Sequence, residues 1–219
     1  ALYNILIFCG RNMMLDREGF DLWANGYDKS VSLSEETNEY PFAGYKNVLN
    51  QIYRTVKQKE NASVFDIGFG TGILTKKLYD DGFDIYGIDF SEKMIEIAKN
   101  KMPKAELIQY DFSNGLPPEI ENIKFDFIIC TYAIHHLNDE QKIAFIHKLQ
   151  RSLRPDGKIL IGDVAFETEK ELEECKANSG ENWDNDESYI IFKKLAPHFC
   201  SAKFHKISYC SGVVTLTEK

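Results

Sequence analysis

The sequence predicts an α/β fold with a doubly wound, mostly parallel sheet of seven strands. Short apolar runs alternate with segments of helical periodicity through residues 62–166, and a glycine-rich turn follows the first run. The last two predicted strands, residues 203–209 and 213–217, are joined through Cys210, Ser211 and Gly212. So short a joint allows only an antiparallel hairpin, which places one antiparallel strand near the edge of the sheet.

Residues 1–14 are set apart from the domain. The apolar stretch at residues 2–9 is too short to cross a bilayer. Met13 and Met14 follow it, and either is suitable as a natural start. Two interpretations stay open for residues 1–14: a non-native or flexible extension, or a short extra element that packs on the domain.

Residues 15–219 are predicted to form one domain. Its four parts are a helical lid at 15–61, a cofactor-binding core at 62–166, a substrate-side insert at 167–198 and a hairpin at 199–219. In the lid, the pattern of aromatic and charged residues indicates helices at 17–27 and 42–59.

The core is expected to repeat a strand followed by a helix. Its strands are predicted at residues 63–67, 84–88, 105–110, 125–130 and 158–164. Its helices are predicted at 72–80, 91–101 and 139–153. Ser91 is a suitable N-cap for the second helix, and the turn sequence at 154–157 is expected to end the third. Two further helices are predicted in the insert, at 168–177 and 189–197.

The composition disfavours several classes of partner. The formal net charge of -8 disfavours binding to phosphate backbones or to anionic lipid, so we expect no nucleic-acid or membrane partner. The five cysteines form no CxxC pair, which favours reduced thiols in a cytoplasmic protein. No set of histidines and carboxylates has the spacing of a metal site, so no metal is predicted.

The strongest chemical signal is the sequence from Asp66 to Gly72. Gly68, Gly70 and Gly72 follow a buried strand and precede a helix, where bare backbone lets a ligand approach closely. The spacing does not fit the G-x-G-x-x-G pattern of nicotinamide sites. A carboxylate at Asp66 would repel a pyrophosphate but suits a ligand with an ammonium or sulfonium charge.

This D-x-G-x-G-x-G loop resembles the cofactor loop of class I S-adenosylmethionine-dependent methyltransferases, which have a Rossmann-like fold. Asp89, at the end of the second strand, is then expected to accept hydrogen bonds from the ribose hydroxyls. The resemblance also implies that Asp111 binds the adenine amino group and that Phe112 flanks the ring. Phe90 and Met94 are expected to line the adenine pocket, although Met94 equally suits the core face of its helix.

The residues from Cys130 to Leu137 leave the fourth strand, a position that faces the reacting methyl group in this family. Cys130 is expected to contact the cofactor and Tyr132 the substrate. His135 or His136 is predicted to act as a general base, His135 being favoured, or else to pack structurally. No N/D-P-P-Y motif is present, which disfavours methylation of an exocyclic base nitrogen.

The N-terminal W-A-x-x-Y-D segment resembles the lid of small-molecule methyltransferases. Tyr27 is expected to approach the cofactor, where an aromatic face attracts the sulfonium. Trp23 and Tyr45 are expected to line the lid and the substrate side. Packing of these aromatics onto the sheet is the alternative.

The combination of F-x-G-Y, G-x-G-T-G, T-Y-A-x-H-H-L and D-x-A-F is similar to the YrrT-like group of bacterial methyltransferases. Here the matching residues are 42–45, 68–72, 131–137 and 163–166. The chain departs from the group at Asp89, where a Glu is typical, and in its shorter, more acidic segment at 170–187.

The sequence therefore predicts methyl transfer from S-adenosylmethionine, with S-adenosylhomocysteine as product, to a small-molecule acceptor that the sequence does not identify. A monomer or a homodimer is expected. A module that binds the cofactor without turnover and an NAD-dependent oxidoreductase are the alternatives. Methylation of RNA or protein is disfavoured by the negative charge.

Overall fold

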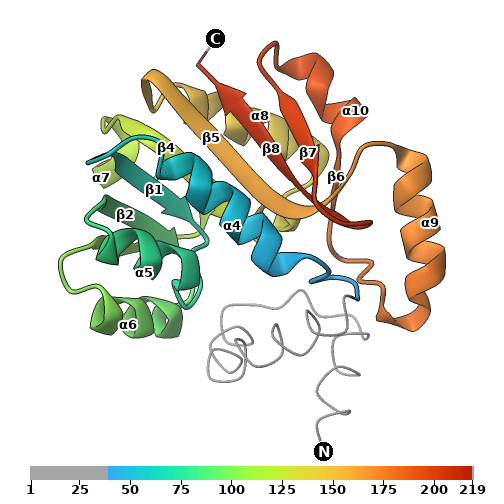
Figure 1. Ribbon diagram of the computed structural model, residues 1–219, viewed down its shortest axis with the longest axis horizontal. Coiled ribbons are helices and arrows are strands. Elements are labelled where there is room, and N and C mark those ends of the chain that lie inside the picture. Colours follow the sequence, from blue (N-terminus) through green and yellow to red (C-terminus); the bar gives the residue numbers. More distant parts are fainter. Residues whose placement is uncertain (1–38, 219) are drawn as a thin grey trace, which may run out of the picture.

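The computed structural model describes residues 39–218, which form one sheet with helices packed against both faces (Figure 1). The strands are β1 Ser63–Ile67, β2 Asp84–Asp89, β3 Glu106–Gln109, β4 Phe125–Thr131, β5 Leu153–Phe166, β6 Ile190–Ile191, β7 Lys203–Lys206 and β8 Ser211–Thr217. Seven of them lie in the order β3-β2-β1-β4-β5-β8-β7, and the short β6 pairs with β5. The sheet thus has eight strands, where the sequence predicted seven.

The strand directions confirm the predicted mixed sheet. Strands β1 to β5 pair in parallel, and β8 runs antiparallel to both β5 and β7. The order reverses between β1 and β4, since the chain proceeds outward to β3 and then returns to the other side of β1. In sheets of this kind, ligands bind at the carboxyl ends of the strands beside such a reversal.

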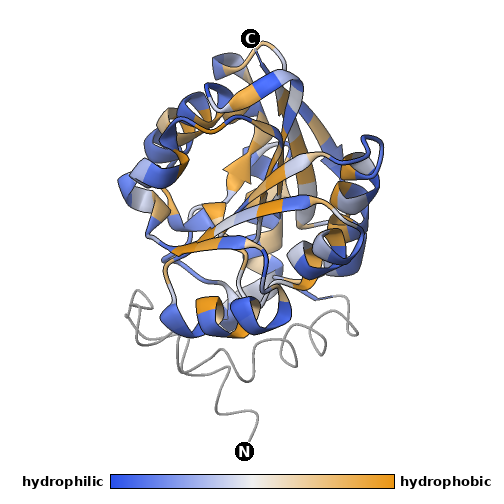
Figure 2. Cartoon of the chain, turned by 90° about the vertical axis from the view of Figure 1, so that its left-hand side faces the viewer, coloured by the Kyte–Doolittle hydropathy of each residue, from blue (hydrophilic) through white to orange (hydrophobic). Residues whose placement is uncertain are grey.

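The helices form two layers. They are α4 Tyr45–Val56, α5 Ile73–Asp80, α6 Glu92–Lys101, α7 Pro118–Glu121, α8 Asp139–Gln150, α9 Glu169–Ser179 and α10 Phe192–Leu195. One apolar cluster packs Leu49 of α4 and Leu78 of α5 against the sheet, and another packs Leu149 of α8 against the opposite face. Figure 2 shows the hydrophobic residues concentrated on the strands between these layers.

The prediction of a connecting turn at residues 154–157 was wrong. Helix α8 ends at Gln150 and β5 begins at Leu153, so those four residues lie inside a strand. Leu153 pairs with Phe125 while Lys158 pairs with Phe127, and the extra residues therefore bulge out of the ladder. Turn-forming residues produce a bulge here because the segments before and after them both pair with the same strand, β4.

The helix predicted at 189–197 forms only in its second half. Ile190 and Ile191 pair with the end of β5 instead, followed by α10 and a 3-10 turn at Ala196–His198. β-Branched residues fit an open strand edge, and that tertiary pairing outweighs the local helical pattern. Strand β7 ends at Lys206, so the hairpin joint is residues 207–210.

The lid is described in part. Of its two predicted helices, that at 17–27 lies outside the described residues. The other is α4, which begins after Gly44 in a left-handed conformation (φ 79°). Within residues 39–218, no helix has both the length and the apolar character needed to cross a membrane.

Candidate functional site

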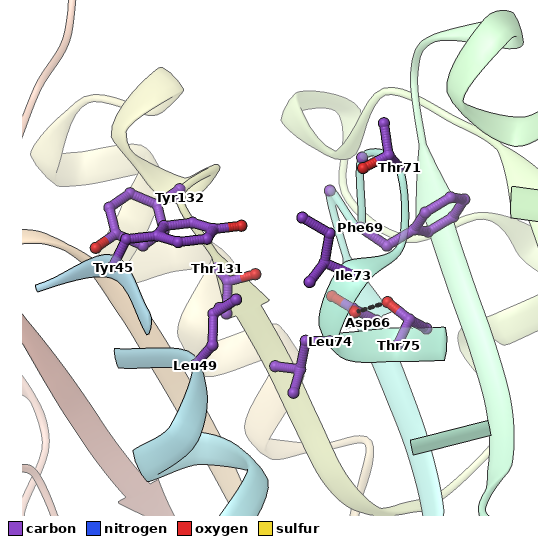
Figure 3. Close-up of a pocket in the computed structure, with 12 residues that line it drawn as sticks. Tyr45, Leu49, Asp66, Phe69, Thr71, Ile73, Leu74, Thr75, Thr131 and Tyr132 are labelled. Carbon is purple, nitrogen blue, oxygen red and sulfur yellow. Dashed lines mark hydrogen bonds between the residues drawn. The ribbon is translucent and has the colours of Figure 1, made fainter. Parts of the chain in front are cut away.

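A cleft lies at the carboxyl ends of β1 and β4, beside the reversal of strand order (Figure 3). It holds about 380 Å³ of empty space, part of it open solvent. Helix α4 borders one side, and the glycine loop with the start of α5 borders the other. The lining residues are Tyr45, Leu49, Asp66, Gly68, Phe69, Gly70, Thr71, Ile73, Leu74, Thr75, Thr131 and Tyr132.

The glycine loop presents bare backbone to the cleft. Gly68, Gly70 and Gly72 all have positive φ, a conformation that side chains other than glycine rarely adopt. A Cβ at Gly68 would come within 2.5 Å of the Ala133 Cβ, so this glycine is required by packing. A Cβ at Gly70 would meet no atom within 4 Å, so the space beside Gly70 is open. Of the three glycines in this loop, only Gly70 has open space at the position of an added Cβ.

Asp66 lies at the base of the cleft with one oxygen unused. Its Oδ2 accepts a hydrogen bond from the Thr75 hydroxyl at 2.6 Å, whereas its buried Oδ1 has no hydrogen-bond partner. Burial raises the pKa of this carboxyl to about 7, with a smaller contribution from Asp89 and an opposing one from the Thr75 hydrogen bond. A buried carboxylate oxygen without a donor is costly, and a ligand that donates a hydrogen bond would satisfy it.

Asp89 connects the glycine loop to the end of β2. Its Oδ2 accepts from the Gly70 backbone N–H at 2.8 Å, and its Oδ1 accepts from the Ser91 N–H at 2.9 Å. Ser91 itself is the N-cap of α6, as predicted, through its hydroxyl and the Met94 N–H. A carboxylate oxygen has two lone pairs, so Asp89 can also accept from a ligand hydroxyl.

The residues predicted near the adenine divide into two groups. Asp111 is exposed, and its Oδ1 accepts from the Ser113 N–H. Phe90 is partly exposed at the end of β2. Phe112 is buried, and its ring lies 5.6 Å from that of Phe145 in the core. Met94 is also buried, on α6.

The end of β4 provides the third wall of the cleft. The Tyr132 ring lies 5.0 Å from the Tyr45 ring, and both line the cleft together with Thr131. The backbone of Tyr132 has a φ of 50°, a left-handed conformation that is unusual and strained for a bulky residue. Its buried hydroxyl lies near Ser211 without a hydrogen bond of ordinary geometry. Cys130 is buried in the core, and burial raises the pKa of its thiol.

His135 does not line the cleft. Its Nδ1 lies 2.8 Å from the Asp163 Oδ1, and its Nε2 lies 3.4 Å from the Glu187 Oε1. The His136 ring lies 4.4 Å from the His135 ring and is more exposed. The base predicted among these histidines stays a prediction.

Sequence reasoning missed three functional candidates. The Thr75 hydroxyl donates a hydrogen bond to Asp66. The carboxylates of Asp163 and Glu187 face the two ring nitrogens of His135. Asp163 had a signal, since it is the acid of the D-x-A-F motif within an apolar strand. Trp23 and Tyr27, the other predicted lid residues, lie outside the described residues.

The described residues, 39–218, show neither a metal site nor a disulfide. No group of three or more histidine, cysteine or acidic side chains in that range is arranged to hold a metal ion. The cysteines at 130, 175, 200 and 210 are all free thiols.

Comparison with known proteins agrees with this arrangement. A family model described as a methyltransferase domain matches residues 64–157. A protein of Alkaliphilus oremlandii, named an uncharacterized methyltransferase, is 34% identical over 180 residues, which are 82% of this chain and 80% of that protein. One of Geobacillus kaustophilus with the same description is 36% identical over 84% of this chain and 86% of its own length.

Solved structures share the fold. Magnesium protoporphyrin IX methyltransferase from Synechocystis, solved with S-adenosylhomocysteine, has a TM-score of 0.63 at 20% identity and covers 80% of this chain and 83% of its own. The complex of DhpI with the same compound has a TM-score of 0.63 at 16% identity, and the match covers 96% and 95% of the two chains.

Proposed function

Because this chain belongs to the class I S-adenosylmethionine-dependent methyltransferases, we propose that it transfers a methyl group from that cofactor to a small-molecule acceptor. The observation that supports the proposal most directly is the buried, unpartnered Oδ1 of Asp66, in the cleft that Gly70 also lines. An anionic oxygen next to bare backbone suits a ligand with a positive charge and hydrogen-bond donors.

The described residues fit the cofactor part by part. Asp66 would receive its ammonium group, and the backbone of Gly68, Gly70 and Gly72 would leave room for its chain. Asp89 would accept from the ribose hydroxyls while it still holds the Gly70 N–H.

The adenine contacts are proposed for residues around the ends of β2 and β3. They are Phe90, Met94, Asp111 and the backbone of Phe112, since the Phe112 ring packs in the core. Cys130 and the N-terminal Tyr27 keep their predicted places near the cofactor as proposals.

S-adenosylmethionine would supply a methyl group that is already activated by its bond to the sulfonium sulfur, so the protein does not have to activate that group itself. The chain's residues would align the methyl acceptor and exclude water. Tyr45 and Tyr132 place aromatic rings at the cleft, where their faces attract a cation. Thr131 adds a hydroxyl between them and the glycine loop.

A small-molecule acceptor is supported by the net charge of -8, which disfavours nucleic acid and anionic membrane surfaces as partners. We also propose a monomer or homodimer in the cytoplasm, a reducing environment in which the four cysteines of residues 39–218 would stay free thiols. One structural neighbour is named for magnesium protoporphyrin IX, a small molecule.

Two measurements on the purified chain test the proposal. Titration calorimetry with S-adenosylhomocysteine should show binding, and no binding would contradict the proposal. Methyl-labelled S-adenosylmethionine should then label the small-molecule fraction of a bacterial extract. Binding without labelling would indicate a cofactor sensor, and labelling removed by protease or nuclease would contradict the small-molecule assignment.

A further inference from the structure

His135 lies between two carboxylates that come from different parts of the chain. Asp163 belongs to β5 and faces Nδ1 at 2.8 Å. Glu187 belongs to the insert at residues 167–198 and faces Nε2 at 3.4 Å. The His135 side chain is 9% exposed, that of Asp163 1% and that of Glu187 24%. The imidazole therefore links the insert to the sheet in a largely buried environment.

This geometry determines the protonation state of the imidazole. A nitrogen that faces a carboxylate is attracted to it only when it carries hydrogen, and here both nitrogens face one. Burial alone lowers the pKa of His135, but the charges of Asp163 and Glu187 outweigh it and raise the pKa to about 9. Lys142 on α8 opposes them, and the rings of His136 and Tyr189 also face the imidazole.

The linkage continues beyond Glu187. The Glu187 Oε2 accepts from the Tyr189 hydroxyl at 2.6 Å, and the Tyr189 hydroxyl is hydrogen-bonded to that of Tyr40. Tyr40 stacks on Trp183 of the insert at 5.0 Å and lies just before α4, whose first residue lines the cleft. The backbone adds one more connection, since the Ser188 N–H donates to the His135 carbonyl at 2.9 Å.

We propose that His135 is an imidazolium and a positioning residue, which ties the insert to β5 through Asp163 and Glu187 and so shapes the methyl-acceptor side of the cleft. The inference rests on the proposed function, because that function assigns the cleft to methyl transfer. In this role His135 does not remove a proton from the methyl acceptor, since Nε2 already carries hydrogen.

The first test uses the ligand-free full chain and needs no methyl acceptor. Nuclear magnetic resonance of the His135 ring should show that it titrates near pH 9, and the Glu187→Gln variant should lower that midpoint. Titration near pH 6.5, the ordinary value of a histidine, would overturn the proposal. Because this measurement involves no cofactor, it remains informative even if S-adenosylhomocysteine does not bind.

The second test is hydrogen exchange at pH 7 in the His135→Gln variant. Amides of residues 183–191 should exchange at least about tenfold faster than in the wild type, while affinity for S-adenosylhomocysteine changes less than about twofold. The control is His205→Gln, an exposed histidine on β7, which should leave the exchange rates unchanged. Unchanged insert exchange in His135→Gln would overturn the proposal. Should that variant fail to fold, raising the pH of the wild type from 8 to 10 should accelerate the same amides more than amides of the central strands, which show only the general base-catalysed increase in exchange.

The third test separates positioning from proton transfer. In the labelled-methyl assay on an extract dilution series, His135→Gln should shift the half-saturating extract concentration upward severalfold and retain most of the maximal rate. A loss of maximal rate of about a hundredfold or more, with half-saturation unchanged, would instead identify His135 as the general base.

Discussion

Two buried side chains on the two sides of the site, Asp66 and His135, use their polar atoms in opposite ways. On the β1–β2 side, the buried Asp66 leaves one oxygen without a partner, and open space lies beside Gly70. On the β4–β5 side, His135 uses both ring nitrogens within the protein. Both sides lie at the carboxyl ends of neighbouring parallel strands, so fold position alone does not distinguish them.

The difference shows how a ligand site can be told from its scaffold. A buried polar atom with unused capacity costs free energy in the empty protein and recovers it on binding. A polar group that is already paired gains nothing from a ligand and instead fixes the shape around it. On this criterion we propose Asp66 as part of the binding site and His135 as part of its support.

The largest effect is expected for Asp89→Ala, which tests whether the β2 side binds the cofactor. The change removes the acceptor of the Gly70 and Ser91 N–H groups together with the proposed ribose contact. Affinity for S-adenosylhomocysteine should fall by about a hundredfold, or ~2.7 kcal/mol. Asp84→Ala, at the exposed start of the same strand, is the matched control and should bind normally. Equal affinity in the two variants would show that Asp89 does not contact the cofactor.

The second prediction is that both stability and cofactor affinity depend on pH through the carboxyl of Asp66. Burial raises the pKa of this carboxyl from 3.8 to about 7, so the folded protein binds a proton more readily than the unfolded chain. Its contribution to the free energy of unfolding of the ligand-free protein therefore increases as the pH falls through about 7 and decreases as the pH rises.

Binding should show the opposite dependence, because a positively charged ligand group prefers the ionised carboxylate. Affinity for S-adenosylhomocysteine should rise roughly tenfold between pH 6 and pH 8 in calorimetry. Asp66→Asn should bind more weakly and with little pH dependence over that interval. A wild-type affinity that is flat with pH would show that Asp66 does not meet the charged group.

The smallest effect is expected for Thr75→Val, which preserves shape and removes the 2.6 Å hydrogen bond to Asp66. That bond lowers the pKa of Asp66, so its loss should leave more of the carboxyl protonated and weaken binding at pH 7 by roughly threefold. Thr55→Val in α4 is the control, since it likewise removes a threonine hydroxyl bond, but Thr55 is not among the residues that line the cleft. Stronger binding in Thr75→Val than in the wild type would contradict this reading.

The sequence predicted the β1–β2 side well because its signals are local. Asp66, the three glycines and the N-cap Ser91 lie within short stretches whose backbone requirements can be read directly, and β1 has the bounds that were predicted. The edge of the insert was mispredicted because pairing with β5 outweighed a local helical pattern at Ile190. Local patterns therefore predicted the backbone of the β1–β2 side and little of the β4–β5 side.

The support around His135 could not be predicted for the same reason. His135 contacts Asp163, which lies 28 positions away in the sequence, and Glu187, which lies farther still. No local sequence pattern could therefore predict these contacts. Phe112 illustrates a different difficulty. An aromatic residue after a strand is suited to a ligand wall or to the core, and only the packing against Phe145 shows that its ring belongs to the core.

The most direct test of the cofactor cleft compares two glycine variants by calorimetry with S-adenosylhomocysteine. Gly70→Ala and Gly82→Ala each place a methyl group at a positive φ with no atom within 4 Å, so their backbone strain should be similar. Only Gly70 borders the cleft. We expect Gly70→Ala to lose affinity at least about tenfold and Gly82→Ala to bind as the wild type does. Equal affinities in the two variants would contradict the assignment of the cofactor to this loop.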